Sequence, residues 1–291
     1  MQNVAGRTAF VTGGASGLGL AMVRAFAAAG MKVAVADVEI HALEQVAAEF
    51  AASNGAVITL PLDVTDRTAM ERAADATEQA FGNVHVVCNN AGVAVGGSVD
   101  SMSYADWDWV LGVNIDGVVN GVQTFTRRIQ AHGEGGHFVN TASMAGHIAV
   151  PGLSVYTLSK FAVVGLSEVM RADLAGHGIG VSVLCPGVVR TNIFESGRNR
   201  PETLATERDT ASLVLAGEGT EAEKRASVEQ LLAGALDPAV VGDMVLHAIQ
   251  NDEFYIFTHP EIQAITEARH SDMNGAFARW NEYRQQHGIQ P

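Results

Sequence analysis

A glycine-rich loop between an apolar run and a helical segment constrains the fold of this chain more than any other feature. The run Thr8–Val11 leads directly into Thr12-Gly13-Gly14-Ala15-Ser16-Gly17-Leu18-Gly19, and an alanine-rich helical pattern then continues to Ala29. Glycines in such a turn let the backbone approach a pyrophosphate, and the first turn of the helix offers unpaired N–H groups and a partial positive charge. The pattern predicts a nucleotide-binding strand, loop and helix, although glycine turns also serve packing alone.

The strand-like run that follows ends in an acidic residue. Met31–Ala36 leads to Asp37, eighteen residues after Gly19. A carboxylate at this position is placed to accept hydrogen bonds from the adenosine ribose diol of NAD and to repel the 2′-phosphate of NADP. No Arg or Lys follows Asp37 closely, and Ser16 inside the loop is not basic. We therefore expect the cofactor to be NAD, against the alternative that Asp37 is an ordinary residue at the end of a strand.

The remaining chain continues to alternate between apolar runs and helical patterns. Further strands are expected at 56–60, 84–88, 136–141, 181–185 and 254–258. Uninterrupted apolar runs are typical of strands that are covered on both faces. The alternation predicts an α/β fold, a Rossmann-like doubly wound parallel sheet of about seven strands with helices on both faces. Residues 1–291 are expected to form a single domain.

Two segments depart from this alternation. From 192 to 238 the periodicity fades and charges become more frequent, so we expect an insertion that acts as a substrate lid. From 261 to 291 a polar helical tail carries Phe277, Trp280 and Tyr283. These aromatic side chains are expected to pack against the domain or against a partner subunit.

Charge and composition exclude several classes of function. The 291 residues carry a net charge of −14 and no run of Lys or Arg, so a surface for nucleic acid has no electrostatic basis. No apolar run reaches transmembrane length and the N-terminus lacks the pattern of a signal peptide, so we expect a cytoplasmic protein without membrane contact. Cys88 and Cys185 lie in apolar runs and are expected to be buried thiols. Two cysteines are too few for a zinc site, and no metal is predicted.

Tyr156 and Lys160 form the strongest candidate for a reactive pair. They are four residues apart in a helical pattern, which places both side chains on one helix face, and Ser143 lies thirteen residues before Tyr156. An ammonium group stabilises a neighbouring phenolate, so Lys160 is expected to lower the pKa of Tyr156 toward neutrality and to allow proton exchange. Ser143 would hold the substrate oxygen. Taken alone, Tyr and Lys at this spacing are common and need be no more than a helix pair.

Other residues stay open between a functional and a structural role. Asp63, next to Val64, is placed either to contact adenine or to cap the helix that begins near Asp66. His85 lies inside a predicted strand and is expected to be structural. The aromatic residues of the segment 104–109 are expected to pack in the core or against another subunit rather than to form a binding site.

Four features occur together and in order: Thr12-Gly13-x-x-x-Gly17-x-Gly19, Asn89-Asn90-Ala91-Gly92, Ser143 with Tyr156-x-x-x-Lys160, and Pro186-Gly187. Through them the chain resembles the short-chain dehydrogenase/reductase superfamily over residues 5–258. The resemblance implies that Tyr156 is the general acid/base, that Lys160 also holds the nicotinamide ribose, and that Ser143 orients the substrate. It further implies that Asn114 positions a proton-relay water, and that a homodimer or homotetramer forms through the helices that contain Asn114 and Tyr156.

The glycine loop and the resemblance together give the expected cofactor contacts. These residues are Gly13, Ser16, Gly17, Leu18, Gly19, Asp37, Asp63, Val64, Asn90, Ala91, Gly92, Tyr156, Lys160, Pro186, Gly187, Val189 and Thr191. The longer Tyr-to-Lys spacing of enoyl reductases in this superfamily is absent, which favours carbonyl and alcohol chemistry over C=C reduction. The expected reaction is hydride transfer between NAD and a secondary alcohol or ketone.

The substrate is expected to be a small and largely apolar molecule. The candidate pocket residues are Val93, Ser143, Met144, His147, Val188 and Phe194, and His147 has a capping or packing role as its alternative. The segments 195–201 and 254–261 are similar to those of NAD-dependent Cα-dehydrogenases that oxidise benzylic alcohols of lignin-derived β-aryl ethers. They are also similar to a wider set of bacterial dehydrogenases.

Alternative functions follow from the same fold. Another apolar alcohol, such as a steroid or a 3-hydroxyacyl compound, is an alternative substrate. A non-catalytic NAD sensor is an alternative function, but it has no need of the intact set Asn114, Ser143, Tyr156 and Lys160. A carbohydrate epimerase or dehydratase is disfavoured by the chain length and the glycine spacing.

Overall fold

The structure, a computed structural model, describes residues 1–52, 56–206, 220, 229 and 233–290. In this part of the chain seven parallel strands form one sheet in the order β3-β2-β1-β4-β5-β6-β7. The strands are β1 (Thr8–Thr12), β2 (Lys32–Asp37), β3 (Val57–Pro61), β4 (Val86–Asn89), β5 (Gly136–Thr141), β6 (Ile179–Cys185) and β7 (Tyr255–Phe257). The strand order reverses between β1 and β4, which opens a crevice at their carboxyl ends. The predicted doubly wound parallel sheet is confirmed.

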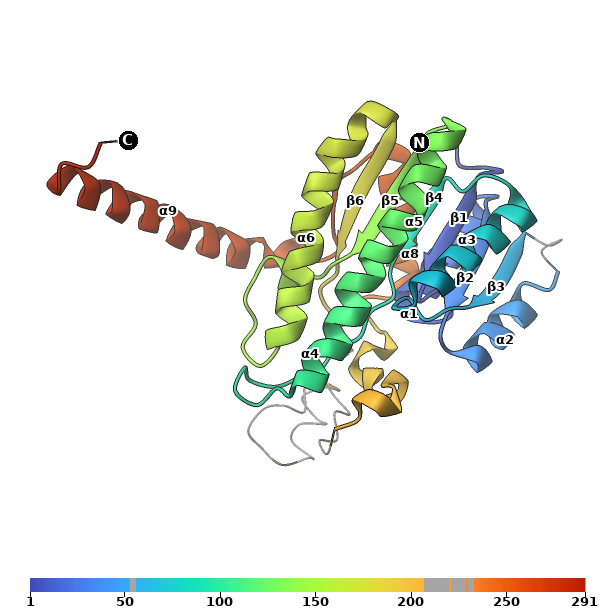
Figure 1. Cartoon of the computed structure of the whole chain (residues 1–291), viewed down its shortest axis with the longest axis horizontal. Helices are drawn as coiled ribbons and strands as arrows, with labels where there is room; N and C mark the ends of the chain where they lie inside the picture. The colour runs from blue at the N-terminus through green and yellow to red at the C-terminus, as the bar shows by residue number, and fades with distance from the viewer. Residues whose placement is uncertain (53–55, 207–219, 221–228, 230–232, 291) are drawn as a thin grey trace.

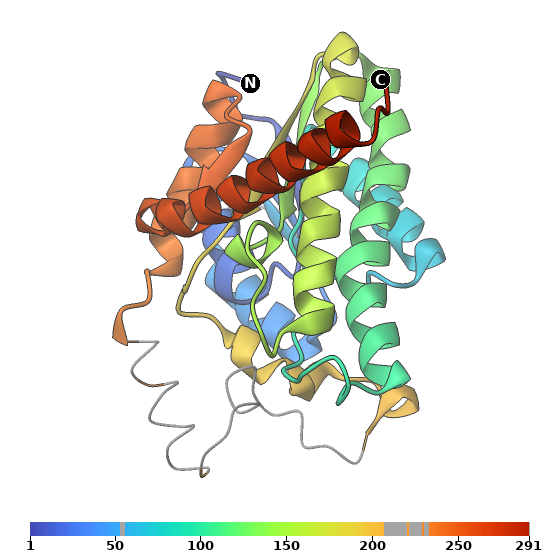
Figure 2. The same ribbon diagram turned by 90° about the vertical axis from the view of Figure 1, so that its left-hand side faces the viewer.

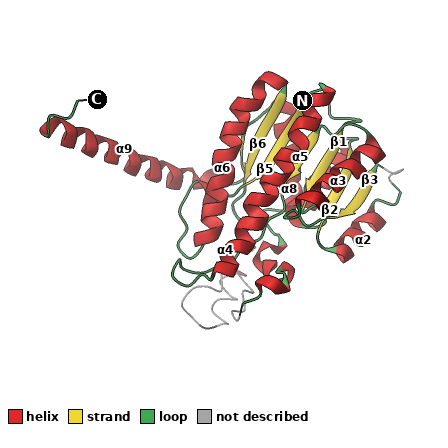
Figure 3. Cartoon of the chain, in the orientation of Figure 1, coloured by secondary structure: helices red, strands yellow, loops and turns green. Residues whose placement is uncertain are grey.

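Helices cover both faces of this sheet (Figure 1; Figure 3). The described α-helices are α1 (Gly17–Ala28), α2 (Ile40–Glu49), α3 (Arg67–Phe81), α4 (Tyr104–Leu111), α5 (Gly117–His132), α6 (Ser154–Leu174), α8 (Pro238–Asn251) and α9 (Gln263–Gln286). Helices α1, α2 and α8 pack on one face, and α3, α5 and α6 pack on the other. The inner strands of the sheet are therefore buried on both sides, as their uninterrupted apolar runs predict.

Successive residues of each inner strand enter opposite cores. In β1, Ala9 and Val11 belong to the core under α1 and α8, whereas Phe10 enters the core under α3 and α5. The ring of Phe10 lies 4.7 Å from that of Phe125, measured between centroids. Because of this two-residue alternation, the three apolar residues at the centre of β1 serve both cores.

The residues that begin α3 decide one of the open alternatives. Asp66 caps this helix, because its carboxylate accepts hydrogen bonds from the N–H groups of Thr68 at 2.8 Å and Ala69 at 2.9 Å. The alternative in which Asp63 caps α3 is therefore wrong. The carboxylate of Asp63 instead accepts from the N–H and hydroxyl groups of Thr65 in the preceding turn.

The long helix expected from Tyr104 onward is divided by a π-helical turn. Helix α4 begins with a capping box in which Ser103 and Asp106 exchange hydrogen bonds. The π-helical turn η1 (Gly112–Asp116) then joins α4 to α5 and carries the buried Asn114. Turns of this kind are rare and occur often at functional sites.

Helix α9 projects away from the body of the molecule (Figure 1; Figure 2). Its root is held near α6, where the Arg269 guanidinium lies 5.1 Å from the centroid of the Phe161 ring. Phe277 and Trp280 are 73% and 66% exposed, and Tyr283 is exposed too. The expectation that these aromatic residues pack against the domain is wrong, and their packing against a partner subunit stays a prediction. None of the described helices has the length and apolar character needed to cross a membrane.

The predicted lid, 192–238, is described only in part. Residues 192–206 contain the short 3₁₀ helices η4 (Asn192–Asn199) and η5 (Glu202–Leu204) and will be called the 192–206 segment. Residues 207–219, 221–228 and 230–232 of the predicted lid lie outside the described residues. The prediction that Cys88 and Cys185 are buried free thiols is confirmed.

Candidate active site

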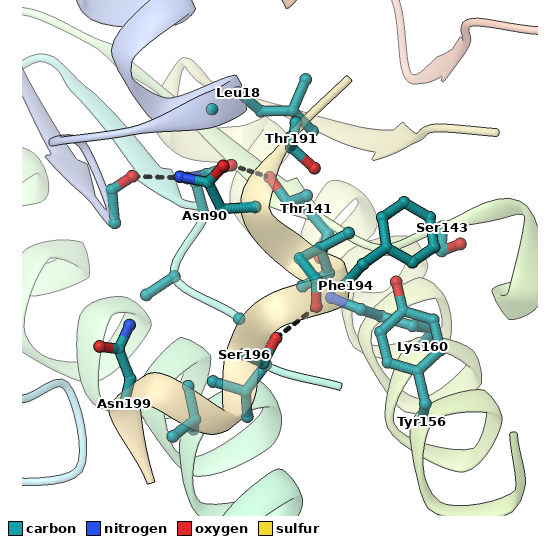
Figure 4. Close-up of a pocket in the computed structure, with 18 of the residues that line it drawn as sticks. Leu18, Asn90, Thr141, Ser143, Tyr156, Lys160, Thr191, Phe194, Ser196 and Asn199 are labelled. Atoms are coloured by element: carbon teal, nitrogen blue, oxygen red, sulfur yellow. Dashed lines mark hydrogen bonds between the residues drawn. The ribbon is translucent and has the colours of Figure 1, made fainter. Parts of the chain in front are cut away.

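A pocket of about 1020 Å³ lies at the carboxyl ends of the parallel strands. Its walls are the glycine loop, the residues that follow β2, β4, β5 and β6, the start of α6, and the 192–206 segment (Figure 4). This volume is at the upper end of the range for small-molecule and cofactor sites. Within the described part of the chain, no group of three or more His, Cys, Asp or Glu residues is arranged to hold a metal ion.

Ser143, Tyr156 and Lys160 meet on one wall of this pocket (Figure 4). Tyr156 and Lys160 lie in the first two turns of α6, and Ser143 follows β5. The ammonium group of Lys160 donates to the carbonyl oxygen of Thr141 at 3.0 Å and lies 5.4 Å from the centroid of the Tyr156 ring. The Ser143 hydroxyl lies beside Tyr156 (Figure 4), donates to the carbonyl oxygen of Pro186 at 3.4 Å and accepts from the N–H group of Ala145 at 3.1 Å. The structure thus brings together the three groups that the spacing predicted.

Burial dominates the ionisation of this pair. It raises the pKa of Tyr156, and the hydrogen bond with Ser143 only opposes this rise. Burial also lowers the pKa of Lys160 to about 8. The expectation that Lys160 brings the pKa of Tyr156 below its usual value is not met in the protein alone, because desolvation disfavours the phenolate and the ammonium alike.

Asn114 lies behind the pocket wall rather than on its surface. Its side chain accepts from the N–H group of Val93 at 2.8 Å and donates to the Val93 carbonyl oxygen at 2.9 Å and to the Ser159 hydroxyl at 3.0 Å. A Cβ atom added to Gly92 would lie 3.4 Å from Asn114 Oδ1 and 3.6 Å from Lys160 Nζ. Gly92 therefore lies between the Asn114 amide and the Lys160 ammonium group, close to both. Asn114 therefore fixes the backbone after β4 beside Lys160, and it is not among the residues that line the pocket.

The glycine loop forms a cradle that side chains would fill. Gly13 and Gly17 have φ values of 60° and 50° and both line the pocket. A Cβ atom on Gly13 would lie 2.9 Å from the Cα atom of Ala91. Gly19 does not line the pocket, contrary to expectation: a Cβ atom there would lie 2.0 Å from the Gly13 carbonyl oxygen, so Gly19 lets α1 pack against the loop. The cradle fits the pyrophosphate of a dinucleotide.

Asp37 holds its carboxylate at the other end of this cradle. One oxygen accepts from the N–H group of Ala15 at 3.0 Å, and the other accepts from the N–H group of Glu39 at 3.0 Å. Burial raises the pKa of Asp37, although the two backbone hydrogen bonds oppose the rise. The position next to the glycine loop fits the hydroxyl groups of an adenosine ribose.

Asn90 connects β4 to the glycine loop. Its side-chain amide donates to the carbonyl oxygens of Thr12 at 3.0 Å and Gly13 at 3.2 Å, and its oxygen accepts from the hydroxyl of Thr141 at 3.2 Å (Figure 4). The remaining predicted cofactor residues also line the pocket. They are Ser16, Leu18, Asp63, Val64, Ala91, Gly92, Pro186, Gly187, Val189 and Thr191.

The predicted substrate residues are brought together with one exception. Val93, Met144, Val188 and Phe194 line the pocket near Ser143, but His147 does not. The ring of His147 packs edge-on against Tyr255 and Phe257, and its Nε2 lies 3.3 Å from Cys185 Sγ. The packing alternative for His147 is therefore the one that the structure supports.

Several pocket residues were missed or misassigned. Trp109 is buried and packs in the core as expected, yet it also lines the pocket, so the aromatic segment at the start of α4 serves both purposes. Other apolar lining residues had no signal in the sequence. They are Ile148, Leu153, Ile193, Leu204 and Ile262.

The 192–206 segment is fixed to the body by a buried ion pair. Arg200 donates to the Asp106 carboxylate at 2.6 Å, and the two side chains are 6% and 0% exposed. The guanidinium also lies 5.1 Å from the centroid of the Trp109 ring. Although burial raises the pKa of Asp106, hydrogen bonds from Arg200 and Ser103 hold it below its ordinary value.

A second ion pair fixes the same segment at the opposite end of the pocket. Arg198 donates to the Glu39 carboxylate at 2.7 Å, and the side-chain amide of Asn199 donates to it at 2.9 Å. Glu39, Arg198 and Asn199 all line the pocket. No sequence pattern marks these contacts, because about 160 residues separate the partners.

Comparisons with known proteins agree with this geometry. Residues 7–202 match the model of the family described as short chain dehydrogenase. The chain is 34% identical over 264 residues to the C alpha-dehydrogenase of Sphingobium sp. strain SYK-6. The alignment covers 90% of this chain and 84% of that protein.

Solved structures show the same fold. A short chain dehydrogenase/reductase from Burkholderia phymatum, crystallised in complex with NAD, has a TM-score of 0.86 and 38% identity, covering 94% of this chain and 96% of that one. The apo form of LigO from Sphingobium sp. strain SYK-6 has a TM-score of 0.79 and 34% identity, covering 100% of this chain and 99% of that one. The chain belongs to the short-chain dehydrogenase family.

Proposed function

We propose that the protein is an NAD-dependent oxidoreductase that transfers a hydride between a secondary alcohol or ketone and the nicotinamide ring. The observation that carries this proposal is that Ser143, Tyr156 and Lys160 lie together on one wall of the pocket, at the end away from Asp37 (Figure 4). The glycine cradle and the Asp37 carboxylate support NAD as the cofactor, and the similar protein from Burkholderia phymatum was crystallised with NAD.

Each residue of the site has a defined part in alcohol oxidation. The Ser143 hydroxyl holds the substrate oxygen, and Tyr156 takes the proton from the alcohol as a phenolate. Lys160 stabilises that phenolate by its positive charge, and Asn114 fixes the backbone of Val93 beside Lys160. A bound NAD would supply the acceptor for the hydride of the carbinol carbon. In the reverse direction Tyr156 donates its proton to the carbonyl oxygen.

The direction of the pKa shift gives this reaction a pH dependence. Burial raises the pKa of Tyr156, so the phenol is the stable form in the protein alone. Alcohol oxidation needs the phenolate and should accelerate as the pH rises above neutrality, whereas ketone reduction needs the phenol and should not. Initial rates in both directions across the pH range check this, and equal profiles would contradict the assigned role of Tyr156.

We infer that the substrate is an apolar aromatic alcohol, such as the benzylic Cα alcohol of a lignin-derived aryl ether. Trp109 and Phe194 line the substrate end of the pocket together with aliphatic residues, which supports an aromatic ring there. The similarity to a C alpha-dehydrogenase supports the same substrate class. Another apolar alcohol, such as a steroid or a 3-hydroxyacyl compound, is the alternative that the apolar lining also allows.

The test is NADH formation with a panel of secondary alcohols, from aliphatic and steroidal alcohols to guaiacylglycerol-type aryl ethers. Turnover confined to the aryl ethers and lost in Tyr156→Phe would support the narrow proposal. Turnover of other alcohols alone would retain the dehydrogenase and discard the aryl ether. Tight NAD binding without any turnover would favour a non-catalytic sensor.

The proposal includes a cytoplasmic homodimer or homotetramer. The exposed Phe277, Trp280 and Tyr283 of α9 support an association that covers them, since such side chains are rarely left in water together. The free thiols of Cys88 and Cys185 are consistent with a reducing compartment. Light scattering on the purified protein tests the assembly, and a monomer at all concentrations would contradict it.

A further inference from the structure

The adenosine end of the pocket contains a basic side chain, Arg198, that no sequence pattern indicated. Among the described residues that line the pocket, the basic ones are Lys160 and Arg198. Lys160 lies beside Tyr156, at the end where the hydride is transferred. Arg198 belongs to the 192–206 segment and meets the body at Glu39, two residues after Asp37. It is therefore the basic group at the ribose end.

Two hydrogen bonds connect this arginine to the ribose-binding carboxylate. The N–H group of Glu39 donates to Asp37 Oδ1 at 3.0 Å, and Glu39 Oε1 accepts from Arg198 Nη2 at 2.7 Å. The hydrogen bond from Arg198 lowers the pKa of Glu39, so Glu39 is ionised at neutral pH. The positive charge of Arg198 is thus neutralised at the place where the 2′-position of the ribose is expected.

The guanidinium of Arg198 has a second anchor that does not depend on Glu39. Its Nη1 donates to the carbonyl oxygens of Asn192 and Glu195, both at 3.0 Å. These bonds leave Nη2 and Nε directed at Glu39. If Glu39 lost its charge, the two nitrogens would remain in place as a fork suited to a phosphate.

We propose that Glu39 is a specificity-determining residue that, together with Asp37, excludes NADP by neutralising Arg198. The inference rests on the proposed NAD-dependent function and extends it. Asp37 repels a 2′-phosphate directly. Glu39 forms an ion pair with Arg198, the one basic side chain at this end of the described pocket, and so keeps Arg198 from binding a 2′-phosphate. Rejection of NADP therefore depends on two carboxylates with different tasks.

The test uses Glu39→Gln, which keeps the length of the side chain and an oxygen for Asn199 and Arg198. Binding of NADH and NADPH to the purified protein is measured by calorimetric titration, independently of turnover. We expect Glu39→Gln to bind NADPH at least about tenfold more tightly than the unaltered protein, since a charge-assisted bond to phosphate replaces an internal ion pair. The affinity for NADH should change less than about threefold, since NADH has no phosphate at this position.

Two further variants make the result specific. The double variant Glu39→Gln/Arg198→Gln should lose the gain in NADPH affinity. Glu49→Gln is the matched control, because Glu49 forms a similar ion pair with Arg24 at 2.7 and 2.8 Å outside the pocket. It removes the same net charge and should leave both affinities unchanged.

The outcomes separate this inference from the proposed function. Unchanged NADPH affinity in Glu39→Gln would overturn the inference, and so would an equal gain in the double variant or in Glu49→Gln. In these cases NADH binding by the unaltered protein would leave the proposed function standing. If the unaltered protein bound neither nucleotide, the proposed function and the inference would both fall.

Discussion

Replacing Lys160 by Met should make the protein more stable at neutral pH while it abolishes turnover. The ammonium group of Lys160 is buried, and in the protein alone its described partner is the carbonyl oxygen of Thr141 at 3.0 Å. Burial without a counter-ion is why its pKa falls from 10.5 to about 8. Methionine has a similar length and no charge, so it fills the same space without the cost of desolvation.

The size of this effect follows from the pKa. A fall from 10.5 to about 8 corresponds to about 3 kcal/mol by which the folded state disfavours the protonated lysine. The hydrogen bond to Thr141 is lost in the Met variant, which costs about 1 kcal/mol. We therefore expect Lys160→Met to raise the free energy of unfolding by about 2 kcal/mol at neutral pH.

The sign of the pH dependence is also fixed. Below a pH of about 8 the folded protein must keep the buried ammonium, so the full cost is present. Between about 8 and 10.5 the folded state releases a proton that the unfolded chain keeps, and the cost declines as the pH rises. The stabilities of the unaltered protein and Lys160→Met should therefore converge toward pH 10.5.

Urea unfolding of both proteins without nucleotide, at neutral and alkaline pH, measures this difference. Ser143→Ala is the control, because it should also lower turnover and yet keep the pH dependence of the unaltered protein. The reasoning is refuted if Lys160→Met is no more stable at neutral pH, or if the difference between the two proteins does not change with pH.

Three other substitutions and one control test the remaining contacts of the site. Asp37→Ala should weaken NAD binding and relax discrimination against NADP, and unchanged cofactor preference in titrations would contradict the role of Asp37. Asp106→Asn should lower the free energy of unfolding by about 3–5 kcal/mol, since Arg200 keeps a buried charge without its counter-ion. A loss below about 1 kcal/mol would mean that the 192–206 segment moves Arg200 into water. Gly19→Ala should abolish nucleotide binding, because the added Cβ atom would lie 2.0 Å from the carbonyl oxygen of Gly13 in the loop. Gly165→Ala is its control, because a Cβ atom at this position of α6 would have no neighbour within 4 Å. It should stabilise the protein by about 0.5–1 kcal/mol. Equal behaviour of the two alanines in binding and thermal unfolding would refute the packing argument.

The sequence predicted those parts of the site that depend on short spacings. The glycine loop, Asp37 at the end of the second strand, and the pair Tyr156 and Lys160 are each defined within one turn or one strand. The parallel sheet then places the carboxyl ends of these strands at one edge, which brings Ser143 to Tyr156. Local pattern and fold topology were sufficient there.

Contacts across long separations could not be predicted in the same way. Arg198 reaches Glu39 over 159 residues, and Arg200 reaches Asp106 over 94 residues, through a segment without periodicity. The ionisation of Lys160 was also beyond the sequence, because it depends on how completely α6 and β5 exclude water. The choice between a pocket role and a packing role for His147 stayed open for a related reason, since its neighbours on β7 lie more than 100 residues away.

The π-helical turn η1 has a consequence for the tolerance of this chain to deletion. Each residue of an α-helix turns the chain by about 100°, and a π-helical turn holds one residue more than an α-helical one. Helices α4 and α5 therefore continue in nearly one line but out of phase by that residue. Removing any one residue of 112–116 would join them into a regular helix and rotate α4 by about 100°. Trp109 would then leave the pocket and Asp106 would leave Arg200, even where the deletion spares Asn114 and the reactive set is complete. The length of this turn is as necessary to the site as the identity of the asparagine it carries.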